Sequence, residues 1–107
     1  MDTRKIKEWI TEKKLDKGNH RLQLNKVVEE VGELAEAINK QKDNVTEEIG
    51  DIVISLITMC MQLEIELEDC VDGAYEKNIN RKGKMYRGHY IKEEDIDPAW
   101  SFDQAKK

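Results

Sequence analysis

The stretch between Asp51 and Glu64 contains no charged residue, and it constrains the fold of this chain more than any other feature. Apolar residues from Val45 to Leu63 spread around most of the circumference of the helix that this region predicts. A helix that is apolar on nearly all sides lies at the centre of a helix bundle or in a subunit interface. The sequence therefore predicts an all-α fold of the four-helix-bundle type, organised around this helix.

Further helices are predicted on both sides of this one, because strand alternation is nearly absent from the chain. A short first helix over residues 2–15 is followed by a break at 17–19, where Asn19 is a suitable N-cap. The second helix runs from there to about Gln41 and carries an apolar stripe at helical spacing. This stripe consists of Leu24, Val27, Val28, Val31, Leu34, Ala35 and Ile38.

The third helix is predicted to begin after Asp43-Asn44, where Asn44 and Glu47 have the spacing of a capping box. A fourth helix is expected over about 67–82, although neither Gly nor Pro separates it from the third. After Gly83 the pattern decays into an irregular tail.

We expect a single domain over residues 1–107, with a core at about 20–82 and a tail or arm at 83–107. The tail mixes aromatic and charged side chains. It is either partly disordered or packs as an arm through three aromatic residues: Tyr90, Trp100 and Phe102.

The charge balance is acidic, because 23 Asp and Glu against 18 Lys and Arg in 107 residues give a net charge of −5. This argues against a nucleic-acid duplex as a partner, since basic surfaces bind the phosphate backbone. It does not exclude a phosphorylated substrate, because a cation held by carboxylates inverts the local field.

The N-terminal segment has no apolar run of the kind found in secretory signals. The weakly polar run Ile52–Met61 has about half the length of a helix that spans a bilayer. We therefore expect a soluble, cytoplasmic protein without a membrane partner. Cys60 and Cys70 lack the spacing of a metal or redox pair, and we expect both to pack in the core.

Two similar acidic segments carry the candidate chemistry. The second and third helices contain Glu29-Glu30-Val31-Gly32-Glu33 and Glu47-Glu48-Ile49-Gly50-Asp51. In each segment the second and last acids are three positions apart and share a helix face. A hairpin of two antiparallel helices could therefore bring four carboxylates together, those of Glu30, Glu33, Glu48 and Asp51.

Acid pairs on helices usually belong to a solvated face, so this alternative is weighed for each helix. On the second helix it fits, since three acids lie opposite the apolar stripe: Glu29, Glu33 and Glu36. On the third helix, the face of Glu48 and Asp51 continues into small or neutral side chains: Ser55, Thr58 and Gln62. A solvated stripe would carry Lys and Glu there, so we expect this acid pair to be partly buried.

Gly32 and Gly50 lie inside these helices, where a glycine costs roughly 1 kcal/mol relative to alanine. We interpret them as points where the helices approach closely beside the acids. The alternative is that a surface position tolerates them.

The mutual repulsion of the acids points to a cation. Two carboxylates about 4 Å apart repel by around 1 kcal/mol in water and by around 4 kcal/mol at an effective dielectric constant near 20. Four would therefore cost several kcal/mol, so the cluster must be protonated, paired with Lys or Arg, or bound to a cation. All-oxygen ligands suit Mg²⁺, Mn²⁺ or Ca²⁺ rather than zinc. A di-iron site would need a Glu three residues before His20 or His89, and neither has one.

The segments EEVGELAEAI and EEIGDIVISL resemble the signature of the MazG-like, all-α nucleoside triphosphate pyrophosphatases, over about residues 20–82. The resemblance implies a helical bundle that assembles as a dimer or tetramer. It implies an enzyme that uses Mg²⁺, with Mn²⁺ as a substitute, to hydrolyse a nucleoside triphosphate to the monophosphate and pyrophosphate. It also implies metal-binding, catalytic acids at Glu30, Glu33, Glu48 and Asp51. Glu29 and Glu47 either orient a water or face solvent.

The resemblance further implies phosphate or sugar contacts near the end of the last core helix, at Lys77, Asn80 and Arg81. The alternative there is a basic helix C-terminus that complements the macrodipole. Trp9 and His20 are candidates to approach the base, although Trp9 at this spacing is also typical of a core. Two other functions stay open: a non-catalytic helical interaction module and a divalent-ion-binding regulatory protein.

Overall fold

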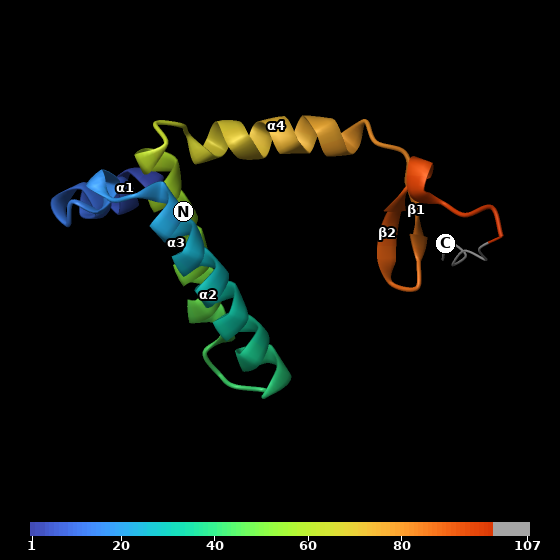
Figure 1. The fold of residues 1–107 in the computed structure, drawn as a ribbon, viewed down its shortest axis with the longest axis horizontal. Helices are drawn as coiled ribbons and strands as arrows, with labels where there is room; N and C mark the ends of the chain where they lie inside the picture. Colours follow the sequence, from blue (N-terminus) through green and yellow to red (C-terminus); the bar gives the residue numbers. More distant parts are fainter. Residues whose placement is uncertain (100–107) are drawn as a thin grey trace. The chain divides into compact units, whose positions relative to one another are not determined.

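The computed structural model describes residues 1–99, which are mainly helical (Figure 1). Their helices are α1 (Thr3–Glu12), α2 (His20–Asn39), α3 (Val45–Gln62) and α4 (Leu67–Ile79), with single 3-10 turns at Leu15–Lys17 and Glu93–Asp95. Two short strands, β1 (Gly83–Tyr86) and β2 (His89–Lys92), pair antiparallel. The prediction of an all-α fold with a helical hairpin as its core is confirmed.

The chain divides into two compact units, of which the first is Met1–Cys70 and the second begins at Val71. The second unit contains most of α4 and the strand pair. The single domain expected over 1–107 stays a prediction. None of the helices among residues 1–99 combines the length and the apolar character that a membrane span requires.

Side-chain caps begin the first two helices. Asp2 accepts a hydrogen bond from the backbone N–H of Lys5 at 3.2 Å, and Asn19 accepts one from that of Arg21 at 2.8 Å. These bonds satisfy backbone donors that a helix N-terminus leaves unpaired. The N-cap predicted at Asn19 is confirmed, whereas α1 ends earlier than expected because Lys14 adopts a left-handed conformation with φ of 58°.

The start of α3 differs from the prediction. Asn44 occupies the N-cap position, but its side-chain amide donates to Oε1 of Glu48 at 3.0 Å. The capping box expected between Asn44 and Glu47 is therefore wrong, because the amide is engaged by a carboxylate one helical turn later.

The helices α2 and α3 form an antiparallel hairpin joined by a short turn at 40–44 (Figure 1). The side of α3 that faces α2 contains Ser55, which is 4% exposed, and Thr58, which is 3% exposed. Glu48 is half-buried on the same side. The prediction that this face of α3 is partly buried is confirmed for Glu48, whereas Asp51 is exposed.

Most of the apolar stripe predicted on α2 lies at the surface. Val27 is buried and Leu34 is half-buried, and both face α3. The other members of the stripe are exposed: Leu24, Val28, Val31, Ala35 and Ile38. Each of these comes one position after a residue that is at least half-buried on the side of α3, so the stripe is turned roughly 100° away from the helix contact.

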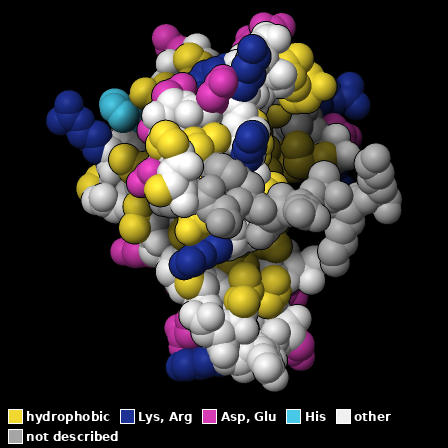
Figure 2. All heavy atoms as spheres, turned by 90° about the vertical axis from the view of Figure 1, so that its right-hand side faces the viewer, with side chains coloured by type: hydrophobic (Ala, Val, Ile, Leu, Met, Phe, Trp, Pro, Cys, Tyr) yellow, Lys and Arg dark blue, Asp and Glu magenta, His cyan; other side chains and the backbone are white. Residues whose placement is uncertain are grey.

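The same offset recurs on α3. Ile49, Ile52, Leu56 and Leu63 each follow a residue of the side that meets α2: Glu48, Asp51, Ser55 and Gln62. Equal rotations in the same sense on two antiparallel helices lead to the same side of the hairpin. We call this combined surface the apolar face, made of Leu24, Val28, Val31, Ala35 and Ile38 of α2 with Ile49, Ile52, Leu56 and Leu63 of α3. Figure 2 shows hydrophobic side chains exposed beside charged ones at the surface that it displays.

The two largest fully buried side chains of the first unit belong to α1 and α3, which pack against each other. Ile10 is 0% exposed and Ile57 is 1% exposed. Gln62 donates from Nε2 to the backbone oxygen of Leu15 at 2.9 Å and so fastens the segment after α1 to the end of α3. Cys60 is buried as expected, but the core position expected for Cys70 is wrong, because that thiol is exposed on α4.

The glycines inside α2 and α3 do not mark a close approach within the chain. A Cβ atom built on Gly32 or Gly50 would meet no heavy atom of the described residues within 4 Å. The close-approach interpretation is therefore wrong, and both positions tolerate glycine at an open helix surface.

The tail is not irregular throughout, since residues 83–92 form the strand pair. Arg87 and Gly88 both have positive φ, 49° and 81°, as a tight hairpin turn requires. A Cβ on Gly83 would lie 2.2 Å from the backbone oxygen of Ile91 and against the ring of Tyr90, whose hydroxyl donates to the backbone oxygen of Arg81 at 3.3 Å. Tyr90 therefore packs within its own hairpin. The expected arm residues Trp100 and Phe102 lie outside the described residues.

The burial of Ile57 predicts a stability difference. Ile57→Ala is expected to lower the free energy of unfolding by about 2–5 kcal/mol, because the lost methylenes leave a cavity between α1 and α3. Leu22→Ala is the control, since Leu22 is 68% exposed and lies off the apolar face, and its cost should be about 0.5 kcal/mol or less. Urea denaturation followed by circular dichroism measures both. Equal costs for the two variants would contradict the packing described for α1.

Candidate active site

The helical hairpin brings the four predicted acids into one group, which we call the acid cluster: Glu30 and Glu33 of α2 with Glu48 and Asp51 of α3. Burial raises the pKa of the Glu48 carboxyl above its ordinary value of 4.5. The nearby charges of Glu33, Asp51 and Glu30 raise this pKa further, and the approach of the Glu33 carboxyl adds to the rise. The Glu48 carboxyl therefore interacts electrostatically with all three other members of the cluster.

Each of the two half-buried acids of the cluster has one oxygen that accepts a hydrogen bond from a neutral donor. Oε1 of Glu48 accepts the hydrogen bond from Asn44, and Oε1 of Glu30 accepts one from the Ser55 hydroxyl across the helix contact. The second oxygen of Glu48, Oε2, is buried and has no hydrogen-bond partner among residues 1–99. A buried oxygen left in this state is costly unless a ligand completes its contacts.

Ser55 is itself held in place. Its backbone oxygen accepts a hydrogen bond from Nε2 of Gln23 at 3.2 Å, so α2 contacts it from two positions, Gln23 and Glu30. From the sequence, Ser55 is expected only as a small or neutral residue of the partly buried face. The structure adds that its hydroxyl serves an acid of the cluster.

The cluster is open to solvent on one side. Glu33 and Asp51 are exposed, whereas Glu30 and Glu48 are half-buried. Glu29 and Glu47 are also exposed, in agreement with the alternative that they face solvent. A solute can therefore reach the carboxylates without any opening of the hairpin.

Such a cluster persists if it is protonated, paired with Lys or Arg, or bound to a cation, and the structure favours the first and the third of these states. Within residues 1–99, the ion pairs of Lys and Arg go to other acids, namely Glu66, Asp16 and Glu36. Partial protonation agrees with the raised pKa of Glu48, and a bound cation agrees with its unpartnered oxygen.

The donor set fits a hard divalent cation, because it consists of carboxylate oxygens and one of them lacks a partner. In the arrangement described for residues 1–99, no three His, Cys, Asp or Glu side chains converge closely enough to hold a metal ion. Side-chain adjustment of the exposed acids Glu33 and Asp51 would be needed to complete coordination.

The residues predicted to contact substrate lie in the second unit, at and after the end of α4. Nδ2 of Asn80 donates to the backbone oxygen of Glu76 at 3.0 Å, and Nη1 of Arg81 donates to Oδ1 of Asn78 at 3.4 Å. Lys77 is exposed in the last turn of α4. These contacts fit a capped helix end, and a role in substrate binding stays a prediction.

Trp9 is 46% exposed, so it is not a plain core residue. It lines a hollow of about 490 Å³ together with Asp2, Lys5, Ile6 and Ile54. Ile54 comes three positions after Asp51 and so shares its side of α3. The sequence alone does not point to Lys5 or Ile6 here, because only the packing of α1 on α3 brings them to this place. His20 is exposed at the start of α2.

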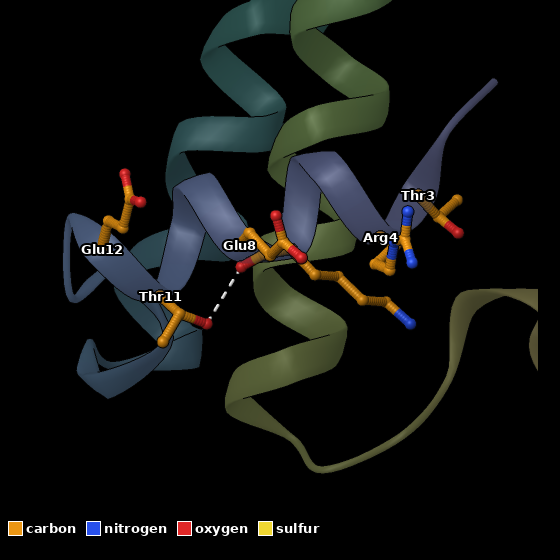
Figure 3. A pocket seen from close by; sticks show the side chains of 6 residues that line it. Thr3, Arg4, Glu8, Thr11 and Glu12 are labelled. Atoms are coloured by element: carbon orange, nitrogen blue, oxygen red, sulfur yellow. Dashed lines mark hydrogen bonds between the residues drawn. The ribbon is translucent and has the colours of Figure 1, made fainter.

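A second hollow, of about 520 Å³, runs along α1 alone (Figure 3). Its lining residues are Thr3, Arg4, Lys7, Glu8, Thr11 and Glu12. Thr11 donates its hydroxyl to the backbone oxygen of Lys7 at 2.9 Å, which is a bond within the helix. This hollow contains no member of the acid cluster, and we assign it no role in the chemistry.

Comparison with known proteins agrees with the sequence resemblance. The family model described as the MazG nucleotide pyrophosphohydrolase domain matches residues 18–86, a range that includes α2, α3, α4 and β1. No curated protein and no solved structure matches the chain.

The raised pKa of Glu48 predicts a pH-dependent stability. An acid whose pKa is higher in the folded chain destabilises that chain as pH rises above the unfolded value, here 4.5, because the folded state then holds more protons than the unfolded state. Glu48→Gln removes this charge, so without metal the variant should be more stable than wild type near pH 7. The difference should vanish near pH 4.

Urea denaturation in a metal chelator, from about pH 4 to about pH 8, measures this difference. Glu8→Gln removes an exposed acid of α1 and should leave the pH profile of wild type unchanged. A Glu48→Gln variant less stable than wild type near pH 7 would show that Glu48 is a structural ion-pair partner instead.

Proposed function

Because the chain belongs to the MazG nucleotide pyrophosphohydrolase family, we propose that it is a Mg²⁺-dependent enzyme acting on nucleoside triphosphates. It would hydrolyse the triphosphate to the monophosphate and pyrophosphate, in the cytoplasm. The observation that carries this proposal is that the three other acids of the cluster lie near enough to Glu48 to raise its pKa, all within the region that the family model matches.

The acid cluster is our candidate metal site. Glu30, Glu33, Glu48 and Asp51 would hold Mg²⁺, for which Mn²⁺ would substitute. Bound there, the ion would neutralise phosphate oxygens and lower the pKa of a coordinated water. Glu30 and Glu48 would form the half-buried floor of this metal site, and Glu33 and Asp51 would form its exposed rim. An acidic protein would in this way bind a polyanion.

For the substrate we keep the assignments that the sequence suggests. Lys77, Asn80 and Arg81 would contact phosphate or sugar, since they present cationic and amide groups at the end of α4. The charge pattern supports an anionic ligand in this part of the chain, because no Asp or Glu occurs between Glu76 and Glu93.

A second copy of the chain is the partner that we propose for the apolar face, giving a dimer or a tetramer. Its α2 residues remain exposed in the single chain, among them Val28 at 63% and Val31 at 49%. Ile49 of α3, at 49%, continues the same face. A continuous apolar surface on two adjacent helices is typical of a helix-bundle interface.

The enzyme proposal predicts a measurable product. Incubation of wild type with Mg²⁺ and a panel of ribonucleoside and deoxyribonucleoside triphosphates should release pyrophosphate. Glu48→Gln should lower this activity by roughly 100-fold or more, because even the partners of metal ligands are worth about 10–100-fold. Glu8→Gln, on the outer surface of α1, should keep wild-type activity.

Two negative results would favour the other functions. If no triphosphate is hydrolysed but Mg²⁺ raises the melting temperature, the chain is a divalent-ion-binding regulatory protein. If Mg²⁺ changes neither activity nor melting temperature, it is a non-catalytic helical interaction module.

The oligomer proposal predicts that charge on the apolar face causes dissociation. The double variant Val28→Glu/Val31→Glu should shift the mass measured by light scattering after gel filtration towards that of a monomer. Raising the protein concentration should reverse this shift only in part. Leu22→Glu is the control, because Leu22 is as exposed as Val28 but lies off this face. A monomeric wild type at about 100 times the concentration used in the assay would contradict the proposal.

A further inference from the structure

We propose that Asn44 and Ser55 are positioning residues, which fix the carboxylates of Glu48 and Glu30 so that each keeps one oxygen for a cation of the acid cluster. This inference rests on the proposed function, because it assigns roles to residues that serve the same site. It is carried by the hydrogen bonds and the burial of the two side chains.

Asn44 gives up its ordinary role in order to contact Glu48. An N-cap side chain normally accepts a hydrogen bond from a backbone N–H of the first turn. Asn44 instead donates from Nδ2 to Oε1 of Glu48 at 3.0 Å. An ionised carboxylate only accepts hydrogen bonds, so the amide must turn its NH₂ group towards it. The orientation of the amide is thus fixed by the acid.

The hydrogen bond between Asn44 and Glu48 leaves one oxygen atom on each of these side chains without a partner in the described part of the chain. Oε2 of Glu48 and Oδ1 of Asn44 are both buried and have no hydrogen-bond partner among residues 1–99. One oxygen of the Glu48 carboxylate is therefore occupied by a neutral donor while the other stays available. A Lys or Arg at position 44 would neutralise the carboxylate, whereas an amide orients it and leaves its charge intact.

Ser55 does the same for Glu30 from the opposite helix. It is 4% exposed in the middle of the charge-free part of α3, and its hydroxyl donates to Oε1 of Glu30 on α2. A serine or threonine inside a helix commonly bonds the backbone oxygen four residues earlier instead. Thr58 behaves in that way, since its hydroxyl donates to the oxygen of Ile54 at 3.0 Å.

Ser55 and Thr58 therefore form a matched pair. Both lie on the side of α3 that meets α2, and both are almost fully buried, at 4% and 3% exposed. Only Ser55 directs its hydroxyl to an acid of the cluster. Removing the two hydroxyl groups separates the effect of positioning from the effect of losing a buried polar atom.

The test measures binding of Mn²⁺ to the full chain without nucleotide, by calorimetry or by the electron paramagnetic resonance of the free ion. Ser55→Ala and Asn44→Ser are each expected to weaken Mn²⁺ binding by roughly 10–100-fold, the usual effect of removing a partner of a metal ligand. Thr58→Val should bind as wild type does. Ser55→Thr keeps the hydroxyl and should restore most of the affinity.

The Asn44 variant is chosen to exclude a role in capping alone. Serine is as good an N-cap as asparagine, but its side chain is shorter and lacks the amide donor. If Asn44 only caps α3, Asn44→Ser binds Mn²⁺ like wild type. If Asn44 positions Glu48, Asn44→Ser binds more weakly although its helix content and melting temperature are kept.

Affinities of Ser55→Ala and Asn44→Ser within about twofold of wild type would overturn the proposal, as would a wild type that binds no Mn²⁺. Should Ser55→Ala fail to fold, Ser55→Cys replaces the hydroxyl by a weak donor of similar shape, and it is expected to weaken binding in the same direction. A wild type that binds Mn²⁺ but hydrolyses no triphosphate refutes the proposed function alone, and the variant affinities still decide the role of Asn44 and Ser55.

Discussion

The contact between α2 and α3 determines most of the other features of the first unit, because its middle is polar. Ser55 and Thr58 are buried there, and half-buried Glu30 and Glu48 lie beside them. Such a contact gains less from the hydrophobic effect than one made of Leu and Ile. The larger apolar side chains are displaced by about one residue on both helices and gather on a separate face. One arrangement thus creates both an acidic site and an apolar surface.

Carboxylates that lie close together without basic partners work against the stability of the fold, and both burial and the neighbouring acids raise the pKa of Glu48. The rest of the unit compensates by ordinary means, through side-chain caps at Asp2 and Asn19 and through the full burial of Ile10 on α1 and of Ile57 on α3. This separation is typical of functional sites, where local destabilisation persists because the surroundings support it. Under the proposed function, a bound cation would offset the repulsion between these acids.

The sequence predicts those features that depend on short-range spacing. The helices, the cap at Asn19 and the partly buried position of Glu48 all follow from periodicity and from the missing charges after Asp51. The sequence does not predict features that depend on a choice between alternative hydrogen-bond partners or packing contacts. The amide of Asn44 chose a carboxylate over the backbone, and Gly32 was open where a contact was expected. The four-residue strands are too short to show alternation, although Gly88 in the turn was a usable signal.

The apolar face also has a consequence for how this chain responds to dilution. When a surface is covered only by a second copy, the free energy of association is added to the free energy of folding, and mass action makes the sum depend on the amount of protein present. The free energy of unfolding of the helical hairpin would then be higher in concentrated solution than in dilute solution. The geometry of the acid cluster, whose members come from the same two helices, would tighten or relax with it, so that abundance itself would tune the site.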